Sequence, residues 1–216
     1  MQFKISKFAL LILSIAGTSF SQATGFELPA VSVSLPVSYG IVVDNSGSLR
    51  LRLERVIKLV GQIIAKNSTD DEAFLVTFVD SDKIVVRQEM TSSQELLIDA
   101  ADNMFIEGGK TAILDALDLS QRYLQENSAG TDRLKRLILI TDGDERSSRA
   151  KFPELLTRLK EARITVFVVG ISDLKLETKL IDRLAKETGG KTYFPMSATE
   201  LDAAAGAIAG DIRKPN

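Results

Sequence analysis

The amino-acid sequence predicts a doubly wound α/β fold, in which a mostly parallel central sheet with one antiparallel edge strand carries helices on both faces. Three observations lead to this prediction. Apolar runs of strand length alternate along the chain with amphipathic segments of helix length. Most of these runs are apolar throughout, as in strands buried on both faces. The 216 residues, 44% hydrophobic and 26% charged, suit one globular domain with a substantial core.

The first 36 residues are expected to precede the body of this domain. Residues 1–23 place two lysines before a short apolar run and end in small residues, which is typical of a cleaved signal peptide. A transmembrane anchor is the alternative, but the run, residues 8–16, is about half of the roughly 20 residues that a spanning helix needs. Residues 24–36 are interpreted as a flexible lead or an edge strand, and residues 37–216 as the domain. We therefore expect a secreted or periplasmic protein without a membrane span after cleavage.

The composition excludes several classes of function. Cleavage of the signal peptide leaves 25 basic and 29 acidic residues, a formal charge of −4, so nucleic acid is not an expected partner. There is no Cys, and the fold must be stable without disulfides. There is also no His, which excludes triads with an imidazole base and histidine-ligated zinc, copper or haem. Any bound metal must be held by oxygen atoms, which makes Mg²⁺, Mn²⁺ and Ca²⁺ the candidates.

The predicted elements begin with a buried strand at residues 37–43. A helix follows at residues 51–64, where apolar residues recur at helical spacing. Residues 73–79 form a second buried strand. A link of three residues then leads to residues 83–87, and so short a link allows only a hairpin. This last segment is therefore the expected antiparallel edge strand.

The second half of the chain continues the alternation of helices and strands. Helices are predicted at residues 92–104 and 111–124, the first of them with serines at its N-cap. A strand at residues 137–140 precedes a helix at residues 152–162, which has proline in its first turn. The remaining predictions are a parallel strand at 164–169, a helix at 177–187 ending just before Gly189 and Gly190, a short strand at 192–194 and a helix at 199–212.

Three loops of this predicted fold carry oxygen groups. Asp44, Ser46 and Ser48 follow the first strand, Thr111 stands at the start of a helix, and Asp142 follows a later strand. Each loop taken alone is more often a simple turn, since Asp, Ser and Gly favour turns for local reasons. The carboxyl ends of parallel strands, however, meet at one edge of the sheet, where ligands of such folds bind. The combination therefore predicts one site built from all five side chains.

On these motifs the chain resembles the von Willebrand factor A (VWA) domain family, which has a Rossmann-like fold and a metal-ion-dependent adhesion site (MIDAS). The matching motifs are Asp44-x-Ser46-x-Ser48, Thr111 in Gly-Gly-Lys-Thr, and Asp142 in Thr-Asp-Gly. The resemblance implies that Ser46 and Ser48 bind the metal directly. It implies that Asp44 and Asp142 bind directly or through water, and that Thr111 joins or leaves the shell with ligand state. A sixth position stays open for an acidic residue of a partner protein.

The charges of the five side chains agree with this resemblance. Two carboxylates and three hydroxyls neutralise a divalent ion but leave it able to attract another oxygen anion. Mg²⁺ takes about six oxygens, whereas Ca²⁺ takes up to about 8 and prefers more carboxylates, so we expect Mg²⁺, with Mn²⁺ or Ca²⁺ as alternatives. The resemblance covers roughly residues 37–212 and is closest to bacterial secreted members. It predicts an exported, metal-dependent protein-binding module for adhesion or complex assembly, of undetermined oligomeric state, and not an enzyme.

Two other functions compete with this prediction. A metal-dependent phosphotransferase or hydrolase could use Asp44 as its nucleophile. Enzymes resembling the haloacid dehalogenase group, however, usually carry a second acid two positions later, where this chain has Ser46. The absence of His also makes a general acid or base hard to find. The other alternative is a VWA fold that has kept the loops without adhesive activity.

Three charged residues border the predicted site. Lys110 precedes Thr111 and could steer an acidic partner, while Asp144 and Glu145 follow Asp142 and could make the rim acidic. We interpret all three first as solvated surface charges.

Overall fold

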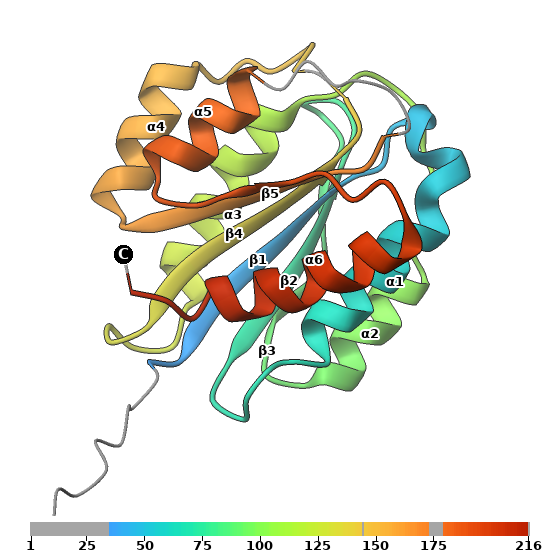
Figure 1. Ribbon diagram of the computed structural model, residues 1–216. Helices are drawn as coiled ribbons and strands as arrows, with labels where there is room; N and C mark the ends of the chain where they lie inside the picture. Colours follow the sequence, from blue (N-terminus) through green and yellow to red (C-terminus); the bar gives the residue numbers. More distant parts are fainter. Residues whose placement is uncertain (1–34, 144, 173–178, 216) are drawn as a thin grey trace, which may run out of the picture. The chain divides into compact units, whose positions relative to one another are not determined.

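The computed structural model describes residues 35–143, 145–172 and 179–215 (Figure 1). Predictions for the signal peptide and for the segment up to residue 34 lie outside this described part. Its strands are β1 (Val37–Asp44), β2 (Glu72–Phe78), β3 (Ile84–Thr91), β4 (Leu134–Thr141), β5 (Ile164–Gly170) and β6 (Thr192–Tyr193). Its helices are the 3-10 helix η1 (Gly47–Arg52), α1 (Leu53–Ile64), α2 (Gln94–Asp102), α3 (Ile113–Asn127), α4 (Phe152–Glu161), α5 (Lys179–Glu187) and α6 (Ala198–Asp211).

The six strands form one sheet in the order β3-β2-β1-β4-β5-β6. β3 runs antiparallel to β2, and the other neighbouring strands are parallel. The predicted mostly parallel sheet with one antiparallel edge strand is therefore confirmed. None of the helices in the described ranges is both long and apolar enough to cross a membrane.

The sheet separates two hydrophobic cores. In β1, Tyr39, Ile41 and Val43 face one core, whereas Val42 faces the other, as the two-residue period of a strand requires. Helices α1, α2 and α6 cover the first face, and α3, α4 and α5 cover the second (Figure 1). Because both faces are covered, the central strands are apolar on both sides, which is the pattern that predicted them.

The order of the strands fixes where a ligand can bind. From β1 the chain proceeds through α1 to β2 on one side of β1, and it later returns through α3 to β4 on the other side. The winding therefore reverses between β1 and β4. In open α/β sheets, the crevice beyond the carboxyl ends of two such strands is the usual place for a ligand.

The boundaries of α3 differ from the prediction in a way that matters for the site. The helix begins at Ile113, two residues later than predicted. Gly108 and Gly109 have φ of +74° and +129°, and the amide of Ala112 donates to the carbonyl of Val79 at 2.9 Å. These contacts hold the backbone before Ile113 in a loop packed against the end of β2, so Thr111 belongs to that loop.

Candidate metal centre

Asp44 is the innermost of the five predicted ligands. It is the last residue of β1 and is 1% exposed. Its Oδ1 accepts a hydrogen bond from the amide of Ser46 at 2.8 Å, and its Oδ2 accepts one from the hydroxyl of Thr141 at 2.7 Å. Thr141 is the last residue of β4, so the carboxylate spans the two strands between which the winding reverses.

Ser48 connects the first loop to Asp142. The hydroxyl oxygens of Ser46 and Ser48 lie 3.0 Å apart, and the Ser48 hydroxyl donates to Oδ1 of Asp142 at 2.7 Å. Asp142 follows β4 and is 9% exposed. Its Oδ2 lies 3.4 Å from Nη1 of Arg52 in η1. The oxygens of these three side chains therefore form one connected row along the edge of the sheet.

Thr111 enters the site beside Gly143. A Cβ atom placed on Gly143 would lie 3.4 Å from the Thr111 hydroxyl oxygen and 4.0 Å from Oδ2 of Asp44. Glycine at this position thus keeps a side chain out of the space between the two ligands. Gly47 similarly faces the loop before α3, since its Cβ would lie 3.9 Å from Cα of Gly108. All five predicted residues therefore lie together.

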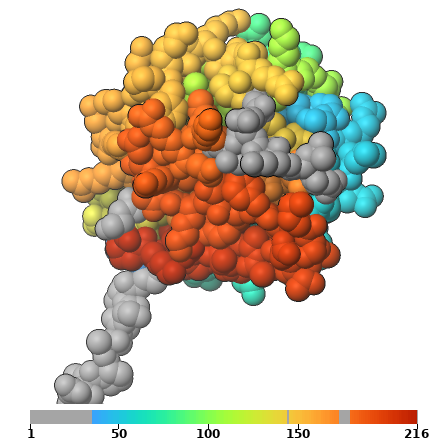
Figure 2. All heavy atoms as spheres, turned by 45° about the horizontal axis from the view of Figure 1, so that its top comes forward, coloured from blue at the N-terminus to red at the C-terminus, as the bar shows by residue number. Residues whose placement is uncertain are grey.

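The segments that carry these residues gather at one end of the sheet. Figure 2 turns the upper end of Figure 1 toward the viewer and shows the segment after β1 in cyan, the loop before α3 in light green and the segment after β4 in yellow. The carbonyl of Asn45 accepts hydrogen bonds from the amides of Glu107 at 3.2 Å and Gly108 at 3.4 Å. The first and second loops are thereby joined through their backbones.

The donor set fits a hard divalent cation. Among the described residues, no three side chains of His, Cys, Asp or Glu cluster as metal ligands, so a metal here would need the hydroxyls as well as the two carboxylates. The oxygen separations of 3.0 Å and 2.7 Å are close to the ~2.9 Å between adjacent oxygens around an octahedral Mg²⁺ with bonds of about 2.0–2.1 Å. That these residues bind a metal stays a prediction.

The electrostatics of the two carboxylates favour a positive ion between them. Burial raises the pKa of Asp44, although hydrogen bonds from Thr141 and Ser46 act in the opposite direction, and the charge of Asp142 raises it further. Burial also raises the pKa of Asp142, against the hydrogen bond from Ser48 and the charge of Arg52. Two buried carboxylates with raised pKa values are stabilised in their charged form by a cation, which removes their mutual repulsion.

Sequence reasoning missed three residues of this site. Thr141 and Arg52 touch Asp44 and Asp142, respectively. Thr141 belongs to the Thr-Asp-Gly motif, which assigns no role to it, whereas Arg52 lies outside the motifs. Glu145 was expected to be a solvated charge, and this expectation is wrong, because its partly buried carboxylate accepts hydrogen bonds from the amides of Leu114 and Ser148 at 2.9 Å and 2.7 Å. The contacts of Thr141, Arg52 and Glu145 with other segments span 97, 90 and 31 positions of the chain, so no local pattern could indicate them.

The sequence of the domain decides its family. Residues 40–206 match the family model of the von Willebrand factor type A domain, which is more than half of the chain. The chain belongs to the VWA domain family. The five site residues of this VWA domain all lie within the matched region. No curated protein sequence matches the chain.

Several solved structures share the fold of this VWA domain. The conserved hypothetical protein BatB from Bacteroides thetaiotaomicron aligns with a TM-score of 0.68 and 18% identity over 82% of this chain and 97% of that chain. The pilus adhesin SpaC from Lactobacillus rhamnosus GG aligns with a TM-score of 0.64 and 18% identity over 82% of this chain and 30% of that chain.

A third similar structure contains a metal. Proximal thread matrix protein 1 from the mussel byssus, solved with a zinc-occupied MIDAS motif, aligns with a TM-score of 0.70 and 17% identity over 82% of this chain and 48% of that chain. At such identities the three structures establish the fold alone. Two of the three are an adhesin and a matrix protein, and VWA domains often serve protein–protein adhesion.

Proposed function

We propose that this VWA domain is an exported, divalent-metal-dependent protein-binding module, used for adhesion or complex assembly, whose bound ion captures an acidic residue of a partner protein. One observation carries the proposal. Asp44, Ser46, Ser48, Thr111 and Asp142 come from three segments and converge at the carboxyl ends of β1 and β4. The oxygen separations of 3.0 Å between Ser46 and Ser48 and of 2.7 Å between Ser48 and Asp142 suit an octahedral ion.

The roles of the five residues follow from their chemistry. Asp44 and Asp142 would supply two negative charges, and the hydroxyls of Ser46, Ser48 and Thr111 would supply neutral oxygens. When bound, the ion would offer a positive coordination position to a carboxylate of the partner. All five donors are oxygens, which favours Mg²⁺ over softer ions such as Zn²⁺, with Mn²⁺ and Ca²⁺ as the alternatives.

The charges around the site are also compatible with an acidic partner. Arg50, in η1, and Lys110, in the loop before α3, are exposed on the segments that carry the proposed ligands. Among the described residues, two neighbouring acidic side chains, Asp80 and Glu107, are engaged within the domain. Oδ1 of Asp80 accepts from the amide of Lys110 at 2.8 Å, and Glu107 forms an ion pair with Arg87. A partner carboxylate would therefore meet exposed positive charges on its approach.

We further propose that the domain is not an enzyme. Two positions after Asp44 stands Ser46, which would be a neutral metal ligand, where a phosphotransferase of the aspartyl-phosphate type usually carries a second acid. Asp142 donates no proton in this arrangement, because its oxygens face Ser48 and Arg52. Metal-dependent turnover of a phosphate ester that is lost in Asp44→Asn would contradict this part of the proposal.

Metal removal tests the proposal. The domain is treated with EDTA, and its melting temperature is measured while MgCl₂, MnCl₂ or CaCl₂ is titrated. At a concentration of 100 times the dissociation constant, a bound ion stabilises the folded state by about 2.7 kcal/mol, or roughly 5–10 °C for a domain of this size. We expect this rise with Mg²⁺. If none of the three ions changes the melting temperature, the proposed function is wrong.

The raised pKa values of Asp44 and Asp142 predict how metal binding depends on pH. Both carboxylates must be ionised to bind a cation, and each binds protons more tightly in the folded metal-free domain than in the unfolded chain. Their own contribution to metal-free stability is therefore greatest at low pH and falls as pH rises through the raised pKa values. Stabilisation by Mg²⁺ should follow the opposite course and decrease as the pH falls from 7 toward the raised pKa values. Isothermal titration calorimetry at successively lower pH measures the change, and an affinity that stays constant until the domain unfolds in acid would contradict it.

A further inference from the structure

The N-terminus of α3 is capped by side chains from a distant loop. The first turn of a helix leaves amides without partners, and a side chain just before the helix usually accepts from them. Here that position is held by Ala112, which has no side-chain acceptor. Instead, the amide of Leu114 donates to Oε2 of Glu145 at 2.9 Å, and the amide of Asp115 donates to the hydroxyl of Ser148 at 3.1 Å. The cap comes from the segment that follows Asp142.

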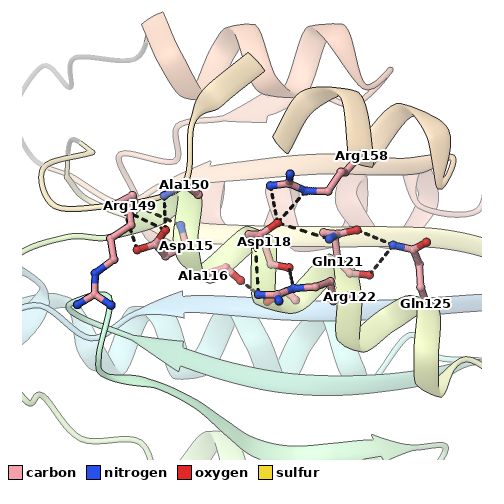
Figure 3. A network of polar contacts seen from close by, with 11 residues as sticks. Asp115, Ala116, Asp118, Gln121, Arg122, Gln125, Arg149, Ala150 and Arg158 are labelled. Carbon is pink, nitrogen blue, oxygen red and sulfur yellow. Dashed lines mark hydrogen bonds and ion pairs between the residues drawn. The ribbon is translucent and has the colours of Figure 1, made fainter. Parts of the chain in front are cut away.

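The first turn of α3 binds this segment in return. The carboxylate of Asp115 points toward the backbone of Arg149 and Ala150 and accepts from their amides, at distances of 2.7 Å to 3.1 Å (Figure 3). On the next turn of α3, Asp118 accepts from Nε of Arg158 in α4 at 3.0 Å (Figure 3). The arrangement is a capping box whose two halves lie on different segments of the chain.

Glu145 also orders its own loop. Its Oε1 accepts from the amides of Ser147 and Ser148 at 3.1 Å and 2.7 Å, and its Oε2 accepts from the Ser148 hydroxyl at 2.8 Å. Together with the amide of Leu114, four donors converge on one carboxylate. Such a carboxylate holds its neighbours in one geometry, because leaving any of these donors without a partner costs free energy.

This set of contacts joins two of the proposed metal ligands. The carbonyl of Thr111 accepts from the amides of Arg146 at 2.9 Å and Ser147 at 3.2 Å. Thr111 lies two positions before the capped helix, and Asp142 lies three positions before Glu145. We propose that Glu145 is a positioning residue, which holds the Thr111 and Asp142 segments at the separation that the metal centre needs. This inference rests on the proposed function, since it concerns the same ion.

Such a role has a physical basis in the strict geometry of small divalent ions. Mg²⁺ tolerates little departure from octahedral coordination, so its affinity depends on how well the ligands are held before it binds. Thr111 lies in a loop outside any strand or helix, and the contact between Leu114 and Glu145 spans 31 positions of the chain. Residues that support metal ligands in this way typically change metal affinity by about 10- to 100-fold when replaced.

The test compares Glu145→Ala with a control that removes a different helix cap. Ser197 caps α6 by accepting from the amide of Glu200, so Ser197→Ala also removes a helix cap. Both variants should melt at a lower temperature than the wild type without metal. The dissociation constants for MgCl₂ and MnCl₂ are then measured by titration calorimetry. We expect Glu145→Ala to weaken binding by about 10-fold and Ser197→Ala to leave it unchanged.

Two further variants distinguish positioning of the proposed metal ligands from a general loss of stability of the domain. Ser148→Ala removes one donor to Glu145 and the acceptor of the Asp115 amide, so it should also weaken Mg²⁺ binding. This variant tests the inference if Glu145→Ala does not fold. In a double-mutant cycle, Glu145→Ala should have a smaller effect on affinity when Thr111 is already Ala, because the part of its effect that acts through the Thr111 hydroxyl is then absent. Wild-type affinity in both Glu145→Ala and Ser148→Ala would overturn the inference and leave the proposed function standing. Absence of metal binding by the wild type would overturn both.

Discussion

Replacing Asp44 with Asn is expected to abolish stabilisation by Mg²⁺ and capture of a protein partner, while the metal-free domain keeps its fold. Asn is nearly isosteric with Asp, but it offers no negative charge to the ion. The pKa of Asp44 is raised because burying its charge costs free energy and because the charge of Asp142 repels it. Replacing Asp44 with neutral Asn removes both costs. The metal-free melting temperature should therefore be equal to or above that of the wild type. In the wild type, Mg²⁺ at 100 times its dissociation constant should stabilise the folded state by about 2.7 kcal/mol, and the variant should lose this stabilisation.

The measurement is a melting curve with MgCl₂ and with EDTA, combined with a pull-down in both conditions. Asp132→Asn is the matched control, because Asp132 is exposed and precedes β4, at the opposite end of that strand from Asp142. It should retain both the Mg²⁺ effect and the metal-dependent capture. Partner capture by Asp44→Asn at the wild-type level would show that the partner binds without the metal ion.

Replacing Gly190 with Ala is expected to destabilise the whole domain by at least about 3 kcal/mol. A Cβ atom at this position would lie 1.9 Å from the carbonyl oxygen and 2.7 Å from the carbonyl carbon of Val166. Val166 lies in β5, between β4 and β6, and its backbone cannot move without breaking the hydrogen bonds of the sheet. The melting temperature should fall by roughly 6–12 °C.

Gly206→Ala is the control for this prediction. Gly206 lies inside α6, and a Cβ there would meet nothing within 4 Å. Ala is favoured over Gly inside a helix, so this variant should gain about 0.5–1 kcal/mol. Chemical denaturation with urea measures both changes. A loss below about 1 kcal/mol for Gly190→Ala would mean that the turn between α5 and β6 can move away from β5.

The pair Gly189 and Gly190 shows where sequence patterns stop being informative. Two glycines after a helical segment predict the end of that helix, and α5 does end at Glu187. Gly189 has φ of +82°, and the amide of Gly190 donates to the carbonyl of Ala185 at 2.8 Å, as expected for a helix that ends at glycine. The need for Gly190 itself arises from the carbonyl of Val166, and no local pattern contains that contact.

Arg136 shows a similar limit within a strand. The sequence predicts that this strand starts at Leu137, directly after charged residues, but β4 begins at Leu134. Arg136 is 1% exposed, and its guanidinium donates to the carbonyls of Ile212 and Lys214 at 3.0 Å and 2.7 Å. A charged residue can be buried there because the end of α6 and the residues after it supply acceptors.

The sequence by itself determined the class of fold, the family and the five side chains of the candidate site. These depend on local properties: apolar runs that must be buried on both faces, and polar loops placed where such strands end. Only the tertiary structure decided that Thr111 lies in a loop before α3, that Thr141 and Arg52 touch the two carboxylates, and that Glu145 caps a helix 31 positions away. Each of these depends on a contact between segments that the fold alone brings together, so its geometry is set by packing and cannot be read from spacing along the chain.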